Sequence, residues 1–468
     1  MVQNCKYYKE KKQVSYDNGI TYIDVVPAEY RKGGLIEAES YDCGGGNPSG
    51  YSGNYLTFVA IDSGTFRFKG SSSSTVNNSS IEYSLDNGST WFTLNRNVNS
   101  PTVQAGSRIM WKGTNLTPVE YNNGTVGIGY FKSTGKYNVQ GNIMSLYYGD
   151  YFEDKTSLSG KKNAFYGLFQ ENYVVNANNL ILPATTLDDS CYQSMFSGCD
   201  LLVTAPSLPA TTMTEDCYNG MFWGCSGLTA APELSATTLE KHCYSYMFAG
   251  CTSLTTAPEL PATTLALGCY QHMFAGCSGL ITAPVLSSTT LALGCYESMF
   301  QECTSLTTPP QLPATTLASN CYTYMFINCS SLTTAPQLSA TTLEGNCYLA
   351  MFQGCTSLVT APSILPATTL AGGCYAQMFE GCTSLTTAPE LPATTFATGC
   401  YNAMFSGCTS LNYIKCLATQ ATSYHSYYTG NWVKGVSSTG TFVKDSTMTT
   451  WPTGDDGIPN NWTVLDAT

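Results

Sequence analysis

The sequence predicts a mainly β protein with short helices. It is built from an N-terminal antiparallel β-sandwich, a solenoid of about ten 26-residue coils and a β-rich C-terminal cap. Two observations predict this architecture. A motif beginning with Cys-Tyr returns every 26 residues through more than half of the chain, and fixed periods of roughly 20 to 50 residues are typical of solenoids and propellers. Before it, short segments alternate between apolar and polar residues and end in turn residues, as antiparallel strands do.

The chain divides into four predicted parts. They are an N-terminal hairpin or attachment segment at 1–33, a β-sandwich domain at 34–150, the repeat solenoid at 163–416 and the cap at 417–468. Segments such as YLTFVA, GTFRFKG and IEYSLDNGSTWFTL indicate the sandwich, because each alternates and each is followed by turn residues. The last part breaks the period and adds three tryptophans, so we expect it to close the final coil.

The repeats read approximately CYxxMFxGCxSLTTAPxLPATTLxxx, and a degenerate copy at 164–187 precedes nine clear ones. The spacing is 26 residues, except for one step of 27 where Ile364 is inserted. The first cysteines of the nine copies are Cys191, Cys217, Cys243, Cys269, Cys295, Cys321, Cys347, Cys374 and Cys400. Each unit buries its apolar side against its neighbours.

Each copy is expected to open with a short helix. In the first copy, Cys191, Met195 and Cys199 recur at i, i+4 and i+8, which places them on one helical face. Ser190 is an N-cap type, and Gly198 suits a left-handed C-terminal cap. The spacing predicts about two helical turns. One or two short strands follow, because the threonine-rich part is bounded by prolines that exclude long central strands.

The MFxGCxSL core, followed by a threonine-rich strand and LPATTL, resembles the BspA-type leucine-rich repeats of surface proteins from gut and oral anaerobes and their phages. The resemblance covers about 164–416 and implies an α/β leucine-rich-repeat-like solenoid. The repeat departs from common leucine-rich repeats by lacking an asparagine ladder and having few leucines. The resemblance implies adhesion to cells, matrix or glycans and no catalysis, so we do not expect an enzyme.

Charge excludes some partners. Net charge is −12, and no Lys or Arg stands between Lys241 and Lys415. Phosphate contacts need cations, so we expect no nucleic acid and no anionic membrane surface to bind there. No apolar run reaches the roughly 18 to 20 residues of a membrane span. The N-terminus has lysines but no apolar region of a secretory signal behind them.

The cysteines pose the question of a metal or redox site. Within one copy they are eight residues apart, about 10 to 12 Å along a helix, beyond the roughly 7 Å limit between the Cα atoms of a disulfide. Bridges between coils remain open, but a buried cysteine also serves as a small apolar residue, and we expect ladders of free thiols. No CxxC pair is present, so no metal site and no cofactor are expected.

The segment SLDNGSTW at 84–91 resembles the Asp-box of sialidases, and SYDNGITY at 15–22 nearly repeats it. The physical content of this motif is a hairpin: Asn-Gly supplies positive φ, the aspartate caps the loop and the aromatic packs beneath. Glycoside hydrolysis also needs a pair of carboxylates surrounded by substrate-binding groups, which the sequence does not supply. We therefore interpret the motif as structural and rank glycan cleavage last.

Candidate binding residues are the side chains that differ between copies. The third position after the first cysteine varies and is expected to face solvent, as it does for His272 in CYQHMFAGC. Tyr246, His272 and Tyr324 in that row, together with Trp223, are the candidates for a binding surface. Free drift of a solvated face explains the same variation equally well. The threonine rows would form arrays, which we interpret as strand formers rather than ice-binding surfaces.

We expect a non-enzymatic binding protein, best matched by a phage tail-fibre or receptor-binding component of the virion that recognises a bacterial surface glycan or protein. Other virion proteins would contact its N-terminal region, where Lys6, Lys9, Lys11 and Lys12 lie; a solvated tail explains these lysines equally well. The alternative is a bacterial cell-surface adhesin for host matrix or glycans. Homo-oligomer formation is compatible with either role.

Overall fold

The structure is a computed structural model. It describes residues 6–8, 13–15, 22–24, 54–70, 80–113, 116, 119–120, 126–420, 426–449 and 451–467. The chain separates into two compact units, Met1–Gly53 and Asn54–Thr468.

In the first unit, β1 (Lys6–Tyr8), β2 (Gln13–Ser15) and β3 (Tyr22–Asp24) form an antiparallel sheet in the order β1-β2-β3. Of the four lysines predicted to serve attachment, Lys6 lies in β1, and the other three lie outside the described residues.

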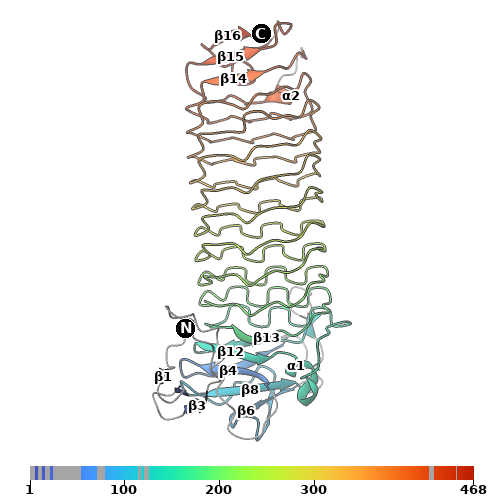
Figure 1. The fold of residues 1–468 in the computed structure, drawn as a ribbon, viewed down its shortest axis with the longest axis vertical. Helices are drawn as coiled ribbons and strands as arrows, with labels where there is room; N and C mark the ends of the chain where they lie inside the picture. The colour runs from blue at the N-terminus through green and yellow to red at the C-terminus, as the bar shows by residue number, and fades with distance from the viewer. Residues whose placement is uncertain are drawn as a thin grey trace. The chain divides into compact units, whose positions relative to one another are not determined.

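The second unit begins with a six-stranded sheet in the order β13-β12-β4-β8-β6-β7. The strands are β4 (Leu56–Ala60), β6 (Ser80–Ser84), β7 (Phe92–Asn95), β8 (Arg108–Gly113), β12 (Tyr137–Asn142) and β13 (Asn179–Ile181). All neighbours are antiparallel except β12 and β13, which are parallel. The pairing of β12 with β13 joins this sheet to the start of the repeats (Figure 1).

A two-stranded ribbon covers the sheet. It pairs β5 (Phe66–Lys69) with β11 (Tyr130–Ser133), and its inward phenylalanines contact the sheet. The ring of Phe58 in β4 lies 4.8 Å from Phe131 and 5.2 Å from Phe66, with Trp111 of β8 beside them at 5.6 Å. These side chains are buried, so the ribbon and the sheet share one hydrophobic core, and the β-sandwich stays a prediction.

Short elements complete this region. A second small hairpin pairs β9 (Val119–Glu120) with β10 (Val126–Gly127). After β12 the chain forms the helices α1 (Ser145–Tyr148) and η1 (Gly149–Tyr151). Together with α2 (Ser426–Thr429) near the C-terminus, these are the helices of the described residues, and none exceeds four residues. The predicted mainly β character is therefore confirmed.

Successive repeats, called coils below, stack in parallel (Figure 1). Backbone amides of one coil donate to carbonyls of the next: the amide of Tyr192 donates to Cys217, and that of Tyr218 donates to Cys243. The degenerate copy at 164–187 joins the stack in the same way, through Phe165 and Cys191.

The predicted helix at the start of each copy is wrong. Residues 190–199 and their equivalents, called the turn segment below, form a series of tight turns. φ is positive at every fourth residue, at Ser190, Ser194 and Gly198 in the first copy and at the equivalent positions in all nine. An α-helix has negative φ throughout, so these residues interrupt it.

Two kinds of hydrogen bond satisfy the turn segment. In the first copy, alternate amides donate three residues back, as Met195 does to the carbonyl of Tyr192. The amides between them donate to the next coil, as Phe196 does to the carbonyl of Met221. The backbone is thus paired without a helix, which removes the penalty of buried, unpaired amides.

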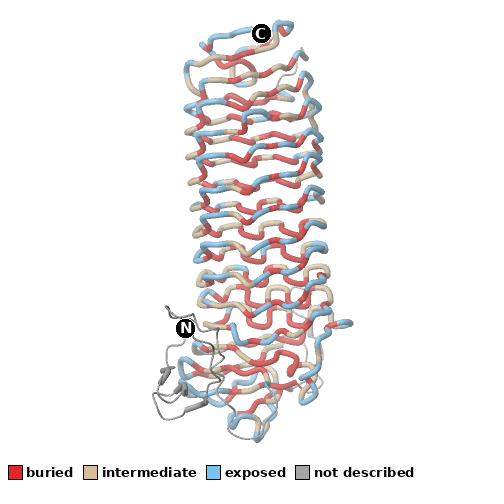
Figure 2. Tube along the Cα trace, in the orientation of Figure 1, coloured by how far each residue is buried: buried red, intermediate tan, exposed pale blue. Residues whose placement is uncertain are grey.

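The four-residue period produces two inward side chains followed by two outward ones. Cys269 and Tyr270 point inward, Gln271 and His272 outward, and Met273 inward again. The alternation of buried and less buried residues along each coil is visible in Figure 2. A spacing of i, i+4 and i+8 fits this four-residue alternation of inward and outward side chains as well as it fits a helix. The wrong prediction of a helix follows from that ambiguity.

The threonine-rich part forms isolated bridges between coils instead of the predicted strands. Thr256 bridges Thr282, and Thr282 bridges Thr308. A second row links Thr290, Thr316 and Thr342. Prolines such as Pro258 and Pro284 follow the first row within two residues and limit pairing there, whereas in three copies Ser235, Ser287 or Ser339 stands where proline precedes the second row.

The core of the stack consists of ladders, in which equivalent side chains pack from coil to coil. Phenylalanine rings from Phe169 to Phe405 lie parallel, with centroids 5.2–5.8 Å apart. A tyrosine ladder from Tyr192 to Tyr401 runs beside it at 5.7–6.0 Å. Each ring is buried, so a coil gains its core only from its neighbours.

The C-terminal region continues the stack. β14 (Tyr413–Cys416), β15 (Thr441–Lys444) and β16 (Thr463–Asp466) form a parallel sheet in that order. Trp432 takes the place of the ladder phenylalanine, because the amide of Phe405 donates to its carbonyl. Its ring stacks on Trp451 at 5.8 Å, and its Nε1 donates to the carbonyl of Gly457. The predicted boundaries at 150, 163 and 417 stay predictions, since contacts group all of Asn54–Thr468 together.

Candidate binding face

The outward side chains of the turn segments form one continuous surface, called the turn face below. Each coil contributes the residue before its first cysteine and the second, third, sixth and seventh residues after it. The inward residues hardly differ between copies, whereas the outward ones do. Differences between coils therefore appear on this face.

Two predicted site residues lie together on it. The rings of Tyr246 and His272 stack with centroids 4.4 Å apart and planes 13° apart. Tyr246 is 37% exposed, and His272 is half-buried. Burial lowers the pKa of His272 and raises that of Tyr246, so both rings are uncharged at neutral pH.

The other two predicted residues lie apart from this pair. Trp223 is 54% exposed and belongs to the coil before Tyr246, but at the sixth position rather than the third. Tyr324 is half-buried and two coils beyond His272, with the buried Ser298 between them.

The expectation that the third position faces solvent is only partly right. Gly220, Ser298 and Ala350 in that row are buried, while Tyr246 is exposed. Small side chains in this outward row end below the level of their neighbours, so they are covered although they point away from the core.

Polar residues that sequence reasoning missed surround the rings. Gln271 donates through Nε2 to Glu297 Oε2 at 3.1 Å. Burial raises the pKa of Glu297, and the bond from Gln271 opposes that shift. Both residues occupy the second position after the first cysteine, so the repeat register was the signal that placed them next to each other.

The coil before Tyr246 carries a second polar group. Asn219 Nδ2 donates to Asp216 Oδ1 at 2.8 Å, and Lys241 of the next coil pairs with Glu215. Lys241 is thus neutralised by a carboxylate. Lys241 also interacts electrostatically with Asp216, although the two make no direct ion pair. This part of the turn face is rich in hydrogen-bond acceptors and poor in free positive charge.

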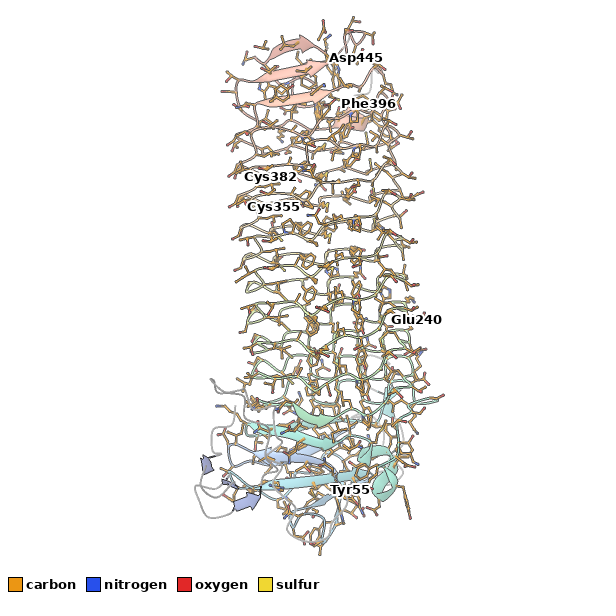
Figure 3. The ribbon with its side chains drawn as sticks, viewed as in Figure 1. Tyr55, Glu240, Cys355, Cys382, Phe396 and Asp445 are labelled. Carbon is orange, nitrogen blue, oxygen red and sulfur yellow. The ribbon has the colours of Figure 1, made fainter. Side chains whose placement is uncertain are left out.

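The nineteen described cysteines are free and buried, as the prediction of thiol ladders requires. The second cysteine of each copy donates its S–H to a phenylalanine carbonyl of the preceding coil at 2.9–3.2 Å, as Cys277 does to Phe248. Cys355 and Cys382 lie one above the other in this ladder (Figure 3).

Burial raises the pKa of the Cys277 thiol to about 12, so it stays protonated and weakly nucleophilic at neutral pH. Within the part of the chain that the structure describes, no group of three His, Cys, Asp or Glu side chains is arranged to hold a metal ion.

The Asp-box segment forms the hairpin loop between β6 and β7. The Asp86 carboxylate accepts hydrogen bonds from the amide and hydroxyl of Thr90, at 2.9 and 2.6 Å, and from Ser84 Oγ at 2.8 Å. These bonds lower the pKa of Asp86 to about 2. Asn87 and Gly88 have positive φ, as this interpretation of the motif requires.

A polar cluster beside this hairpin was not predicted. Lys112 of β8 is nearly buried and contacts Asp150 at 2.8 Å and Glu82 at 3.5 Å, with its ammonium 4.4 Å from the Trp91 ring. Tyr55 donates to Asp150 at 2.7 Å, and Lys112 lowers the pKa of that carboxyl. The cluster ties η1 to the sheet. Because these ion pairs compensate the charge of the buried lysine, we interpret the cluster as stabilising the fold.

Comparisons with known proteins assign the chain to no family. No family model matches the chain, and no curated protein matches it. The crystal structure of a TLR13–ssRNA13 complex is similar at 14% identity and a TM-score of 0.25, over 65% of this chain and 38% of that one. A likeness at this level decides neither fold nor function. Within the described residues no helix is long and apolar enough to cross a membrane.

Proposed function

We propose that the chain is a non-enzymatic binding protein, in which a BspA-like, leucine-rich-repeat-like solenoid of about ten coils presents the turn face to a surface glycan or protein. The observation that carries the proposal is the separation of roles along each turn segment. Inward residues form near-identical ladders, whereas outward residues vary and gather three aromatic side chains, Trp223, Tyr246 and His272, in three successive coils. Exposed aromatic rings are common anchors of binding surfaces.

The charge of the solenoid supports this choice of ligand. From residue 242 to residue 414 no Lys or Arg occurs, and the chain carries a net charge of −12. A polyanionic partner would be repelled, because its phosphates need cations. Uncharged groups with many hydroxyls, as in glycans, suit a surface of acceptors and rings.

A binding role without catalysis is also supported by the carboxylates outside the repeats. Asp86 is held by three hydrogen bonds within its own loop, and Asp150 is paired with Lys112. Neither is poised as a general acid, since the pKa of each is lowered rather than raised.

For location, we propose a virion component of the tail-fibre or receptor-binding type, on the basis of the repeat's resemblance to surface proteins of anaerobes and their phages. The N-terminal unit would contact other virion proteins. The alternative is a bacterial cell-surface adhesin. Immunoblotting of purified virions and of cell envelopes with an antibody against the chain separates the two. A signal confined to the envelope would refute the virion assignment.

Binding itself is tested by applying the labelled full chain to an immobilised glycan array and to intact bacterial cells. The proposal predicts saturable binding that falls when Trp223, Tyr246 and Tyr324 are changed together to alanine. Absence of binding to every glycan and to every cell type would refute it. Binding that the triple variant retains would place the site away from the turn face.

A further inference from the structure

The third-position row of the turn face is interrupted beside its aromatic pair. Tyr246 and His272 stack on each other, so one face of each ring is covered. The next coil on the Tyr246 side carries Gly220 at the equivalent position, and a glycine offers no ring. Among the described residues, the second face of Tyr246 has no ring partner.

A Cβ atom added at Gly220 would have room. A Cβ built there meets only Ser194 Oγ at 3.4 Å and Trp223 Cβ at 3.8 Å, which are ordinary contacts. Gly220 has φ of 59°, close to the 54° of Tyr246 and of His272. The backbone at Gly220 therefore has the geometry that holds a ring in the two following coils.

The surroundings of Gly220 combine an aromatic ring, polar groups and a carboxylate. Along its own coil, Trp223 stands on one side, and Asp216, with Asn219 bonded to it, stands on the other. Ser194 belongs to the coil below, and Tyr246 to the coil above. Lys241 adds no free cation, because it pairs with Glu215.

We propose that this place, the Gly220 subsite, binds one uncharged pyranose ring of a surface glycan. The apolar C–H face of the sugar lies against Tyr246 and Trp223, and its hydroxyls bond to Asp216, Asn219 and Ser194. This occupant matches the site, because ring faces favour an apolar disc, while carboxylate and amide oxygens accept from hydroxyls. The carboxylate of Asp216, beside a Lys241 that is already paired with Glu215, disfavours a carboxylated or phosphorylated sugar. The inference rests on the proposed function and names its ligand class.

The test is calorimetric titration of the full chain with three neutral hexasaccharides, made of glucose, mannose and N-acetylglucosamine units, and with the anionic trisaccharide 3′-sialyllactose. At least one neutral sugar is expected to bind at least tenfold more tightly than the anionic one. Gly220→Tyr is the blocking variant, since its ring would stack on Tyr246 as Tyr246 does on His272. It removes no existing side chain and is expected to weaken binding at least tenfold, as is Trp223→Ala.

Tyr173→Ala is the control, because it removes a half-exposed tyrosine that lies outside the turn face. It should bind as the unchanged chain does. Neutral sugar binding that survives both Gly220→Tyr and Trp223→Ala would overturn the subsite and leave the proposed function standing. Equal loss in Tyr173→Ala, or equal affinity for 3′-sialyllactose, would also overturn the subsite. If no sugar binds the unchanged chain, the subsite is overturned, and the array and cell assays then decide the proposed function.

Unfolding curves of each variant identify any variant that fails to fold. If Gly220→Tyr fails to fold, Trp223→Ala keeps the test decisive.

Discussion

Replacing one alanine by glycine distinguishes the turn segment from a helix, because the change in the free energy of unfolding has a different sign in the two structures. Ala403 occupies the third position of the last copy, with φ of 51°. Ala275 is the matched control: it is also half-buried and outward, but its φ is not positive. Both substitutions remove the same methyl group, so the difference between them isolates the backbone.

The magnitude follows from two opposing contributions. A residue with a Cβ pays about 1–2 kcal/mol in the left-handed region, and Ala403→Gly relieves that strain. Glycine costs about 0.5–1 kcal/mol through the greater freedom of the unfolded chain. Ala403→Gly should therefore be neutral to stabilising, by up to about 1.5 kcal/mol, whereas Ala275→Gly should destabilise by about 0.5–1 kcal/mol. In a helix both would destabilise equally.

Native-state hydrogen exchange, read by mass spectrometry on peptides covering 400–408 and 269–277, suits this test because long repeat stacks need not unfold in one step. The 1–2 kcal/mol difference corresponds to local opening constants that differ by about 5- to 30-fold between the two variants. Equal destabilisation by Ala403→Gly and Ala275→Gly would refute the positive φ in this row and restore the helix.

Three further predictions concern named interactions. Cys277→Ala should open its coil about 0.5–1 kcal/mol more easily than Cys269→Ala, because only Cys277 donates its thiol to a carbonyl of the preceding coil. Equal hydrogen-exchange effects would show that the thiol bond adds nothing. Burial lowers the pKa of His272, so the unfolded chain binds its proton first, and stability falls as pH drops below the ordinary value of 6.5. Thermal unfolding between pH 7.5 and 5 should therefore show a smaller loss for His272→Gln than for the unchanged chain, and identical profiles would contradict this. Lys112→Met should cost about 1–2 kcal/mol in urea unfolding, since it leaves two carboxylates without their partner. Lys155→Met, which breaks an exposed ion pair, should cost much less. Equal costs would mean that burial of the ion pair is irrelevant.

The sequence was most informative where residues repeat in register. The period fixed which side chains stack, so the ladders of Tyr270 and Phe274 and the free thiols follow from it directly. Glycine before the second cysteine correctly indicated positive φ, as at Gly276. The same spacing could not distinguish a helix from the four-residue alternation of the turn segment. The deciding residues, such as Tyr246 and Ala350, are not types that signal a left-handed backbone.

The candidate site was predictable only in part. Tyr246 and His272 occupy equivalent positions of adjacent copies, so their stacking follows from the register. The tertiary contacts of Lys112 join β8 to η1, and no sequence period relates these elements. The structural interpretation of the Asp-box succeeded because its hydrogen bonds, centred on Asp86, are local.

One comparison tests the central claim that the turn face carries binding. The full chain, the double variant Trp223→Ala/Tyr246→Ala and the control Thr237→Ala/Thr263→Ala are applied to the same glycan array. The control pair comes from the same two coils and is exposed in the threonine-rich part. The account predicts at least tenfold weaker binding for the aromatic double variant, about 1.4 kcal/mol, and unchanged binding for the threonine variant. Loss in the threonine variant alone, or unchanged binding in both, would contradict it.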